Sequence, residues 1–184
     1  MDDLIVERQG NTTMKKTAVQ LGDDSLADAF RELMNAVINM REAGVDLNQV
    51  QHAPEFTYLL TPKQFDRIKR ICREKGWPEP NQRGILMDLQ AIAHPLDARE
   101  TKDHCTSEEA LQILVNAYCA YSQVGLNKPK HAQGILFNTG RKVSIGRGSY
   151  YALAVVKVCE DGVRRYLAPV TAYHATEAKI RKIR

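Results

Sequence analysis

The chain has 184 residues, of which 43% are hydrophobic and 26% are charged, as is ordinary for a globular protein. No apolar run reaches the ~18 residues that a membrane-spanning helix needs. The acidic start, MDDLIVERQG, lacks the basic residues and apolar core of a secretory signal. We therefore expect a protein of the cytoplasm, either of its own cell or of a target cell into which it is delivered, with no membrane partner.

The four cysteines lie far apart in the sequence, and none belongs to a CxxC pair. This spacing argues against a zinc site and favours free thiols in a reducing compartment.

Charge is unevenly distributed along the chain. Residues 1–55 contain 5 Lys/Arg against 10 Asp/Glu, whereas residues 128–184 contain 12 against 3. The overall charge of +4 therefore conceals a basic C-terminal third. Such a segment suits a polyanionic partner such as RNA. A basic face that only keeps the protein in solution is the alternative.

The first half of the chain reads as mainly helical. Residues 1–22 show no periodicity and are expected to be loose. Residues 23–44 predict a helix with Ser25 as its cap, and its apolar stripe from Leu26 to Met40 either covers the core or seats a partner. A short extended piece is expected over residues 52–60, and a helix from Thr61 to Gly76.

The middle of the chain predicts two further helices. Residues 83–95 have helical spacing, and Pro95 is expected to end that helix before a polar loop over 94–105. Residues 106–125 predict a helix that starts with a capping box of Thr106 and Glu109.

Short β-branched and aromatic segments separated by turns follow Gly125, and Asp161-Gly162 marks a hairpin. The predicted fold class is therefore α+β, with N-terminal helices followed by an antiparallel meander of three to four strands. Residues 1–50 are expected to form a helical extension or linker, and residues 51–184 the functional α+β domain.

Strict alternation along the last strand predicts one packed face and one wet, cationic face. Ala168, Val170 and Ala172 would pack against the helix that starts at Thr106. The opposite face would carry Arg165, Thr171 and Tyr173, with Lys157 from the neighbouring strand.

Cleaving RNA without a metal needs a base for the ribose 2′-OH, an acid for the leaving oxygen, and donors for the charge that develops on phosphorus. The loop 94–105 and the last strand supply these groups if the helix between them folds back on the sheet. The predicted catalytic residues are His94, Arg99, His104, Lys157, Thr171 and Tyr173. The predicted RNA-binding residues are Arg141, Lys142, Arg147, Arg165, Lys179 and Arg181.

Each of these residues also has an ordinary structural interpretation, as a surface charge, a helix end or a plain strand residue. His131 is expected to be a basic-loop residue, and His174 either joins the site or points into the core. No metal or cofactor is expected. HExxH and Walker patterns are absent from the sequence, and acidic pairs suited to two-metal catalysis, such as DxD, are absent from its basic C-terminal third.

Residues 82–176, with a His-bearing polar loop, a capped helix and a meander that ends in VTAYH, resemble the metal-independent ribonuclease superfamily of barnase, EndoU, colicin D and RelE, in its phage- and toxin-associated branch. The resemblance implies a bacterial or phage endoribonuclease toxin that cleaves RNA, often tRNA, and is neutralised by a small immunity or antitoxin protein. It places the loop histidine at His94 or His104, the sheet cation at Lys157 or Arg147, and the hydroxyl pair at Thr171 and Tyr173. The sequence departs from the family pattern by its second loop histidine, by His174 and by its acidic N-terminal segment.

Two other functions remain open from the sequence. One is a non-catalytic nucleic-acid-binding protein of a mobile element, which would bind nucleic acid with steep salt dependence and leave it intact. The other is a host-directed effector whose basic face meets an acidic protein and whose Leu26–Met40 stripe seats a partner.

Overall fold

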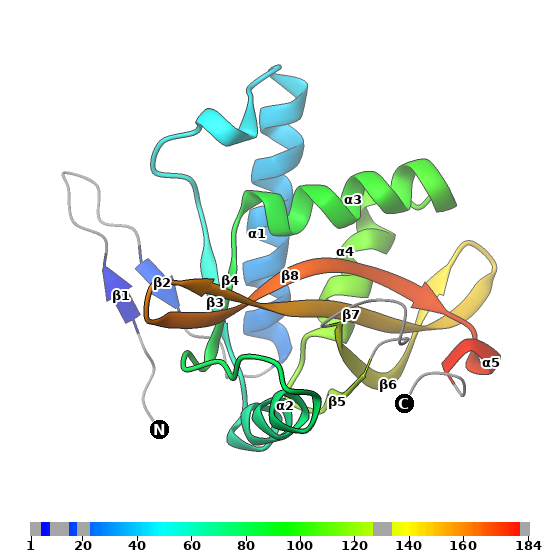
Figure 1. The fold of residues 1–184 in the computed structure, drawn as a ribbon. Helices are drawn as coiled ribbons and strands as arrows, with labels where there is room; N and C mark the ends of the chain where they lie inside the picture. The colour runs from blue at the N-terminus through cyan, green and yellow to red at the C-terminus, as the bar shows by residue number, and fades with distance from the viewer. Residues whose placement is uncertain (1–4, 8–14, 18–22, 127–133, 181–184) are drawn as a thin grey trace.

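A computed structural model of the chain describes residues 5–7, 15–17, 23–126 and 134–180. The fold is α+β, with a mixed six-stranded sheet in the order β3-β4-β8-β7-β6-β5 (Figure 1). All neighbouring strands are antiparallel except β4 and β8, which are parallel. The strands are β3 (Phe56–Leu59), β4 (Gly84–Met87), β5 (Gln123–Leu126), β6 (Ile135–Ile145), β7 (Gly148–Asp161) and β8 (Arg164–Ala175).

A second, two-stranded sheet pairs β1 (Ile5–Glu7) with β2 (Lys15–Thr17), which the expectation of a loose segment over residues 1–22 missed. The helices are α1 (Asp23–Glu42), the 3₁₀ turn η1 (Leu47–Gln49), α2 (Pro62–Lys75), α3 (Leu89–Asp103), α4 (Ser107–Ala117) and α5 (Glu177–Ile180). α1, α3 and α4 pack on one another, α4 also packs on β6, β7 and β8, and α2 contacts β5. Within the described ranges, no helix combines the length and hydropathy of a membrane span.

The capped helices follow the sequence prediction closely. Thr61 and Gln64 form a capping box at the start of α2, and Gly76 ends it with φ +70°. Thr106 and Glu109 form the same device at the start of α4. α4 nevertheless ends at Ala117, earlier than predicted, because the chain turns into β5.

Residues 83–105 differ from the prediction of a helix followed by a polar loop. Ile85 and Met87 are buried and Leu86 is exposed, which is the alternation of a strand, β4. Asp88 then caps α3 by accepting the Ala91 N–H (2.9 Å). Pro95 lies inside α3 and does not end it.

The predicted polar loop is therefore wrong, since residues up to Asp103 are helical. An interior proline costs a helix about 3 kcal/mol. Burial of Leu89, Ile92, Ala93 and Leu96 against the core opposes that cost.

The core lies between the sheet and the layer of α1, α3 and α4. The apolar stripe of α1 is part of it: Leu26, Phe30, Leu33 and Val37 are buried. Phe30 meets Phe56 of β3 edge-on, with ring centroids 4.9 Å apart. The stripe therefore covers the core and is not a free seat for a partner. The division of the chain near residue 50 stays a prediction, although side chains on both sides of it share this core.

β8 contains a bulge that changes which residues share a face. Thr171 pairs with Val155 and Pro169 pairs with Val156, so Val170 is the extra residue. Leu167 and Pro169 consequently lie on the core side with Ala172, and Thr171 lies on the opposite side. The prediction that Arg165 and Thr171 share a face is wrong, because one inserted residue inverts the alternation.

Candidate functional site

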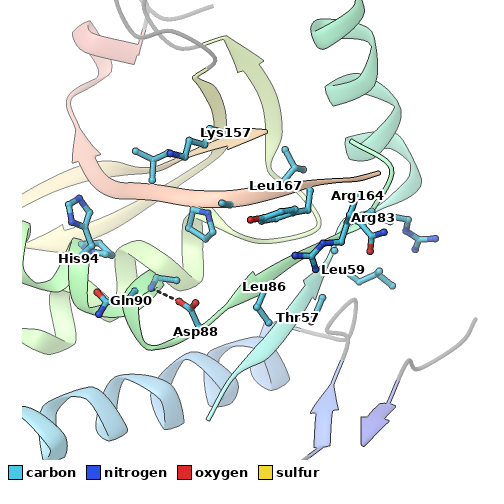
Figure 2. A pocket seen from close by; sticks show the side chains of 18 residues that line it. Thr57, Leu59, Arg83, Leu86, Asp88, Gln90, His94, Lys157, Arg164 and Leu167 are labelled. Atoms are coloured by element: carbon cyan, nitrogen blue, oxygen red, sulfur yellow. Dashed lines mark hydrogen bonds between the residues drawn. The ribbon is translucent and has the colours of Figure 1, made fainter. Parts of the chain in front are cut away.

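A groove of about 960 Å³ opens where β4 and β8 diverge (Figure 2). The two parallel strands pair at Ile85 and Leu167, after which β4 ends at Met87 and the chain turns into α3. Residues of β3 and β4 that alternate with the buried ones, Thr57, Leu59, Gly84 and Leu86, line one side of the groove. Residues of β8, Lys157 of β7 and the first half of α3 line the rest.

The groove is basic. His94, Lys157 and Arg164 are exposed in it, and Arg83 is half-buried. Asp88 is the one carboxylate among the described lining residues, and it is engaged as the cap of α3. An anionic ligand therefore meets three cationic side chains, one imidazole and one carboxylate that already accepts a hydrogen bond.

The sheet holds these side chains in place. Arg83 donates from Nε to the carbonyl of Leu60 (2.8 Å). Arg164 lies over the ring of Tyr166, 4.4 Å from its centroid, and contacts Asp161 at 3.4 Å. Lys157 is paired in register with Ala168, which also lines the groove. An aromatic ring covered by a guanidinium offers a flat, cationic surface of the kind on which nucleic-acid bases stack.

Beyond the groove, α3 continues beside β8 towards the C-terminal end of that strand (Figure 1). There, burial raises the pKa of Tyr173, and the nearby Arg99 guanidinium opposes this. Burial lowers the pKa of His174, and Asp103 is the strongest of the charges that oppose this. Near pH 7 these two residues therefore present a phenol and a neutral imidazole.

The predicted catalytic residues fall into two groups along this seam between α3 and β8. His94 and Lys157 line the groove. Arg99 lies near Tyr173 at the far end of the seam, away from the groove lining. Thr171 follows the bulge on the same side of the sheet as Lys157 but does not line the groove. His104 is exposed and caps α3 with φ +55°.

Among the predicted RNA-binding residues, none of those that the structure describes lines the groove. Arg165 donates from Nε to the carbonyl of Glu79, and Arg147 lies in the turn between β6 and β7. The other described members lie over tyrosine rings: Arg141 over Tyr121 (5.2 Å), Lys142 over Tyr151 (5.4 Å) and Lys179 over Tyr173 (4.7 Å). Arg181 and His131 lie outside the described residues.

Three groove residues were missed by sequence reasoning: Arg83, Arg164 and Tyr166. Arg83 was read as the start of a helix, although it precedes β4. Strict alternation placed Tyr166 on the same, packed face as Ala168, Val170 and Ala172, because the bulge at Val170 has no sequence signal beyond Pro169. The neighbouring Arg164, Arg165 and Tyr166 combine cations with an aromatic ring, and this pattern is the sequence signal that could have found Arg164 and Tyr166.

Comparisons with protein-family models, with curated proteins and with solved structures found no match for this chain. The resemblance to the barnase, EndoU, colicin D and RelE superfamily therefore stays a prediction, and the functional argument depends on the groove itself.

Proposed function

We propose that this protein is a metal-independent endoribonuclease that binds RNA in the groove between α3, β4 and β8. The observation that carries the proposal is the convergence of His94 and Lys157, which come from a helix and a strand far apart in sequence, with Arg83, Arg164 and Tyr166 in one groove. Cations for phosphates, a ring for a base and an imidazole for proton transfer are what the reaction requires.

In the proposed reaction, His94 accepts the proton of a ribose 2′-OH, and the 2′ oxygen attacks the adjacent phosphorus. The bond from phosphorus to the 5′ oxygen breaks, which leaves a 2′,3′-cyclic phosphate and a 5′-OH. Lys157 and Arg164 stabilise the negative charge that develops on the phosphate oxygens. The phenol of Tyr166 gives its proton to the leaving 5′ oxygen, which becomes the 5′-OH.

The test is cleavage of bulk tRNA by the full-length protein in the presence of EDTA. We expect fragments with 2′,3′-cyclic ends, and a loss of about 10²- to 10⁴-fold in rate for His94→Gln, as is typical when a general acid or base is removed. His104→Gln tests the other predicted histidine, and the exposed His52→Gln serves as the matched control. Intact RNA with folded wild-type protein, or equal rates for wild type and His94→Gln, contradicts the proposal.

A second candidate is a non-catalytic RNA-binding protein of a mobile element. One observation favours it: among the described lining residues the groove holds a single histidine, and Arg99, Thr171 and Tyr173 lie outside it. Salt-sensitive RNA binding in the groove without cleavage would select this candidate.

The proposal extends to a partner. If the protein is a toxin of a phage or of competing bacteria, its immunity or antitoxin protein is expected to be acidic and to cover the groove. A partner of this kind would protect His94 and Lys157 from solvent and block RNA binding.

A further inference from the structure

A second group of chemically active side chains lies at the far end of the seam, outside the groove. Asp103 ends α3, Cys105 lies in the link between α3 and α4, and His174 lies near the end of β8. One carboxylate oxygen of Asp103, the Cys105 sulfur and one ring nitrogen of His174 all lie within 4.8 Å of one another.

The backbone explains why these residues meet. His104 adopts the left-handed region, with φ +55°, and the Cys105 N–H returns to the carbonyl of Arg99 (3.1 Å). This sharp reversal brings residues 103 and 105, on either side of His104, to one point. The bulge at Val170 places His174 on the core side of β8, where it faces that point.

Two buried nitrogens have no hydrogen-bond partner among the described residues: Nδ1 of His174, which belongs to this cluster, and Nε of the neighbouring Arg99. Arg99 instead contacts Oδ2 of Asp103 through its terminal nitrogen. A buried imidazole nitrogen without a partner is costly unless a ligand or ion satisfies it. Glu109 and Asp103 act electrostatically on both Cys105 and His174, and the Arg99 guanidinium opposes them at both residues.

We propose that Asp103, Cys105 and His174 bind one Zn²⁺ ion, with water in the fourth position. Oxygen, sulfur and nitrogen donors together are a ligand set that zinc accepts and that harder cations such as Mg²⁺ do not. The absence of CxxC pairs argued against zinc from sequence, but ligands on different elements leave no such spacing. Asp103 follows His94 by nine residues of α3, or about 14 Å of helix, so this ion lies apart from the groove.

One consequence of binding this ion is structural, even though a site with three protein ligands and a water is not the closed kind that purely structural zinc has. The ion ties the end of α3 and the start of α4 to the end of β8, and so fixes the position of α3, which carries His94. The proposal does not depend on RNA cleavage and is compatible with metal-independent chemistry in the groove.

A nucleophilic cysteine assisted by His174 is the other chemistry that these residues suggest. The structure disfavours it, because burial raises the pKa of Cys105, and Glu109 and Asp103 raise it further. A cysteine activated for catalysis has the opposite shift.

The test is metal binding by the full-length protein after treatment with a chelator. We expect one Zn²⁺ per chain by calorimetry, a higher melting temperature with Zn²⁺, and a thiolate-to-metal charge-transfer band with Co²⁺ as the probe. Asp103→Asn and His174→Gln should each weaken Zn²⁺ binding at least tenfold, and Cys105→Ser should abolish the Co²⁺ band. Cys159→Ser is the matched control, because Cys159 is a free cysteine outside the cluster.

Asp103 is exposed, so Asp103→Asn is expected to fold even if substitution of the buried Cys105 does not. Folded wild-type protein that takes up no stoichiometric Zn²⁺ overturns the proposal, as does uptake that Asp103→Asn and His174→Gln leave unchanged. Rapid, selective alkylation of Cys105 in protein that takes up no Zn²⁺ would assign the cluster to nucleophilic chemistry instead.

Discussion

At the residue scale, Gln64 shows how one buried polar side chain organises its surroundings. It is 4% exposed, and its Oε1 accepts from the Tyr58 hydroxyl (3.0 Å) and the Thr61 N–H (3.1 Å). Its Nε2 donates to the carbonyls of Cys119 (2.9 Å) and Ser122 (3.0 Å). One amide therefore caps α2 and also anchors the link between α4 and β5.

Gln64→Glu is predicted to lower the free energy of unfolding by about 2–4 kcal/mol, because a carboxylate cannot donate to the two carbonyls and is costly to bury. Urea unfolding measures this, and the exposed Gln49→Glu, with an expected change within about 0.5 kcal/mol, is the matched control. Equal stability of Gln64→Glu and wild type would show that these hydrogen bonds contribute nothing net.

The cap function of Gln64 was implicit in the sequence, since Thr61 and Gln64 have capping-box spacing. Its contacts with Cys119 and Ser122 were not, because they cross more than fifty residues. The same contrast holds for the site. His94 and Lys157 were named as candidates from the sequence. That they share a groove with Arg83 and Arg164 depends on strand pairings that no local pattern reveals.

At the element scale, Glu109 links the start of α4 to the turn between β6 and β7. Its carboxylate accepts the Thr106 N–H (2.9 Å) and the Gly146 N–H. These backbone hydrogen bonds, first that of Thr106 and then that of Gly146, lower the pKa of Glu109. The link therefore contributes stability above the unfolded-state pKa of about 4.3 and loses it as the pH falls through the lowered folded-state value.

We predict that Glu109→Gln destabilises the protein at pH 7 and that the difference from wild type shrinks as the pH is lowered below about 4, where wild-type Glu109 becomes protonated. Urea unfolding of both proteins at neutral and acidic pH gives the two differences. Glu74→Gln on α2, exposed and far in sequence from this link, is the control. A difference that is constant with pH would mean that the charge of Glu109 plays no part.

Elements with local signals were predictable and elements decided by packing were not. The caps of α2 and α4 and the hairpin at Asp161-Gly162 are set by neighbours in sequence, and the structure confirms them. β4 and α3 have apolar residues at spacings compatible with a continuous helix, and only pairing with β3 and β8 makes residues 84–87 a strand. Pro95 was likewise expected to end the helix, because a proline inside a helix is unfavourable locally. Burial of the apolar residues of α3 opposes that local cost.

At the scale of the whole molecule, the parallel pairing of β4 with β8 creates the groove. An antiparallel meander alone, as predicted, has no such divergence. The pairing of Ile85 with Leu167 closes a loop of some eighty residues. The described part of that loop forms α3 and α4, which pack beside the sheet, and β5, β6 and β7, which extend it. The predicted α+β class is correct. The position of the groove could not be predicted from local sequence patterns, because it depends on the pairing of β4 with β8.

The most direct test of the account is the salt dependence of single-stranded RNA binding, measured for wild type and for the double variant Lys157→Gln, Arg164→Gln. Single strands release about 0.7 counterion per phosphate contact, and the double variant removes two contacts. It should therefore make the plot of the logarithm of the binding constant against the logarithm of salt concentration less steep by about 1.4, and weaken binding. The variant Lys63→Gln, Arg67→Gln, which removes two exposed cations from α2, should leave the slope unchanged. An unchanged slope for the groove variant, or an equal fall for both variants, would contradict RNA binding in the groove.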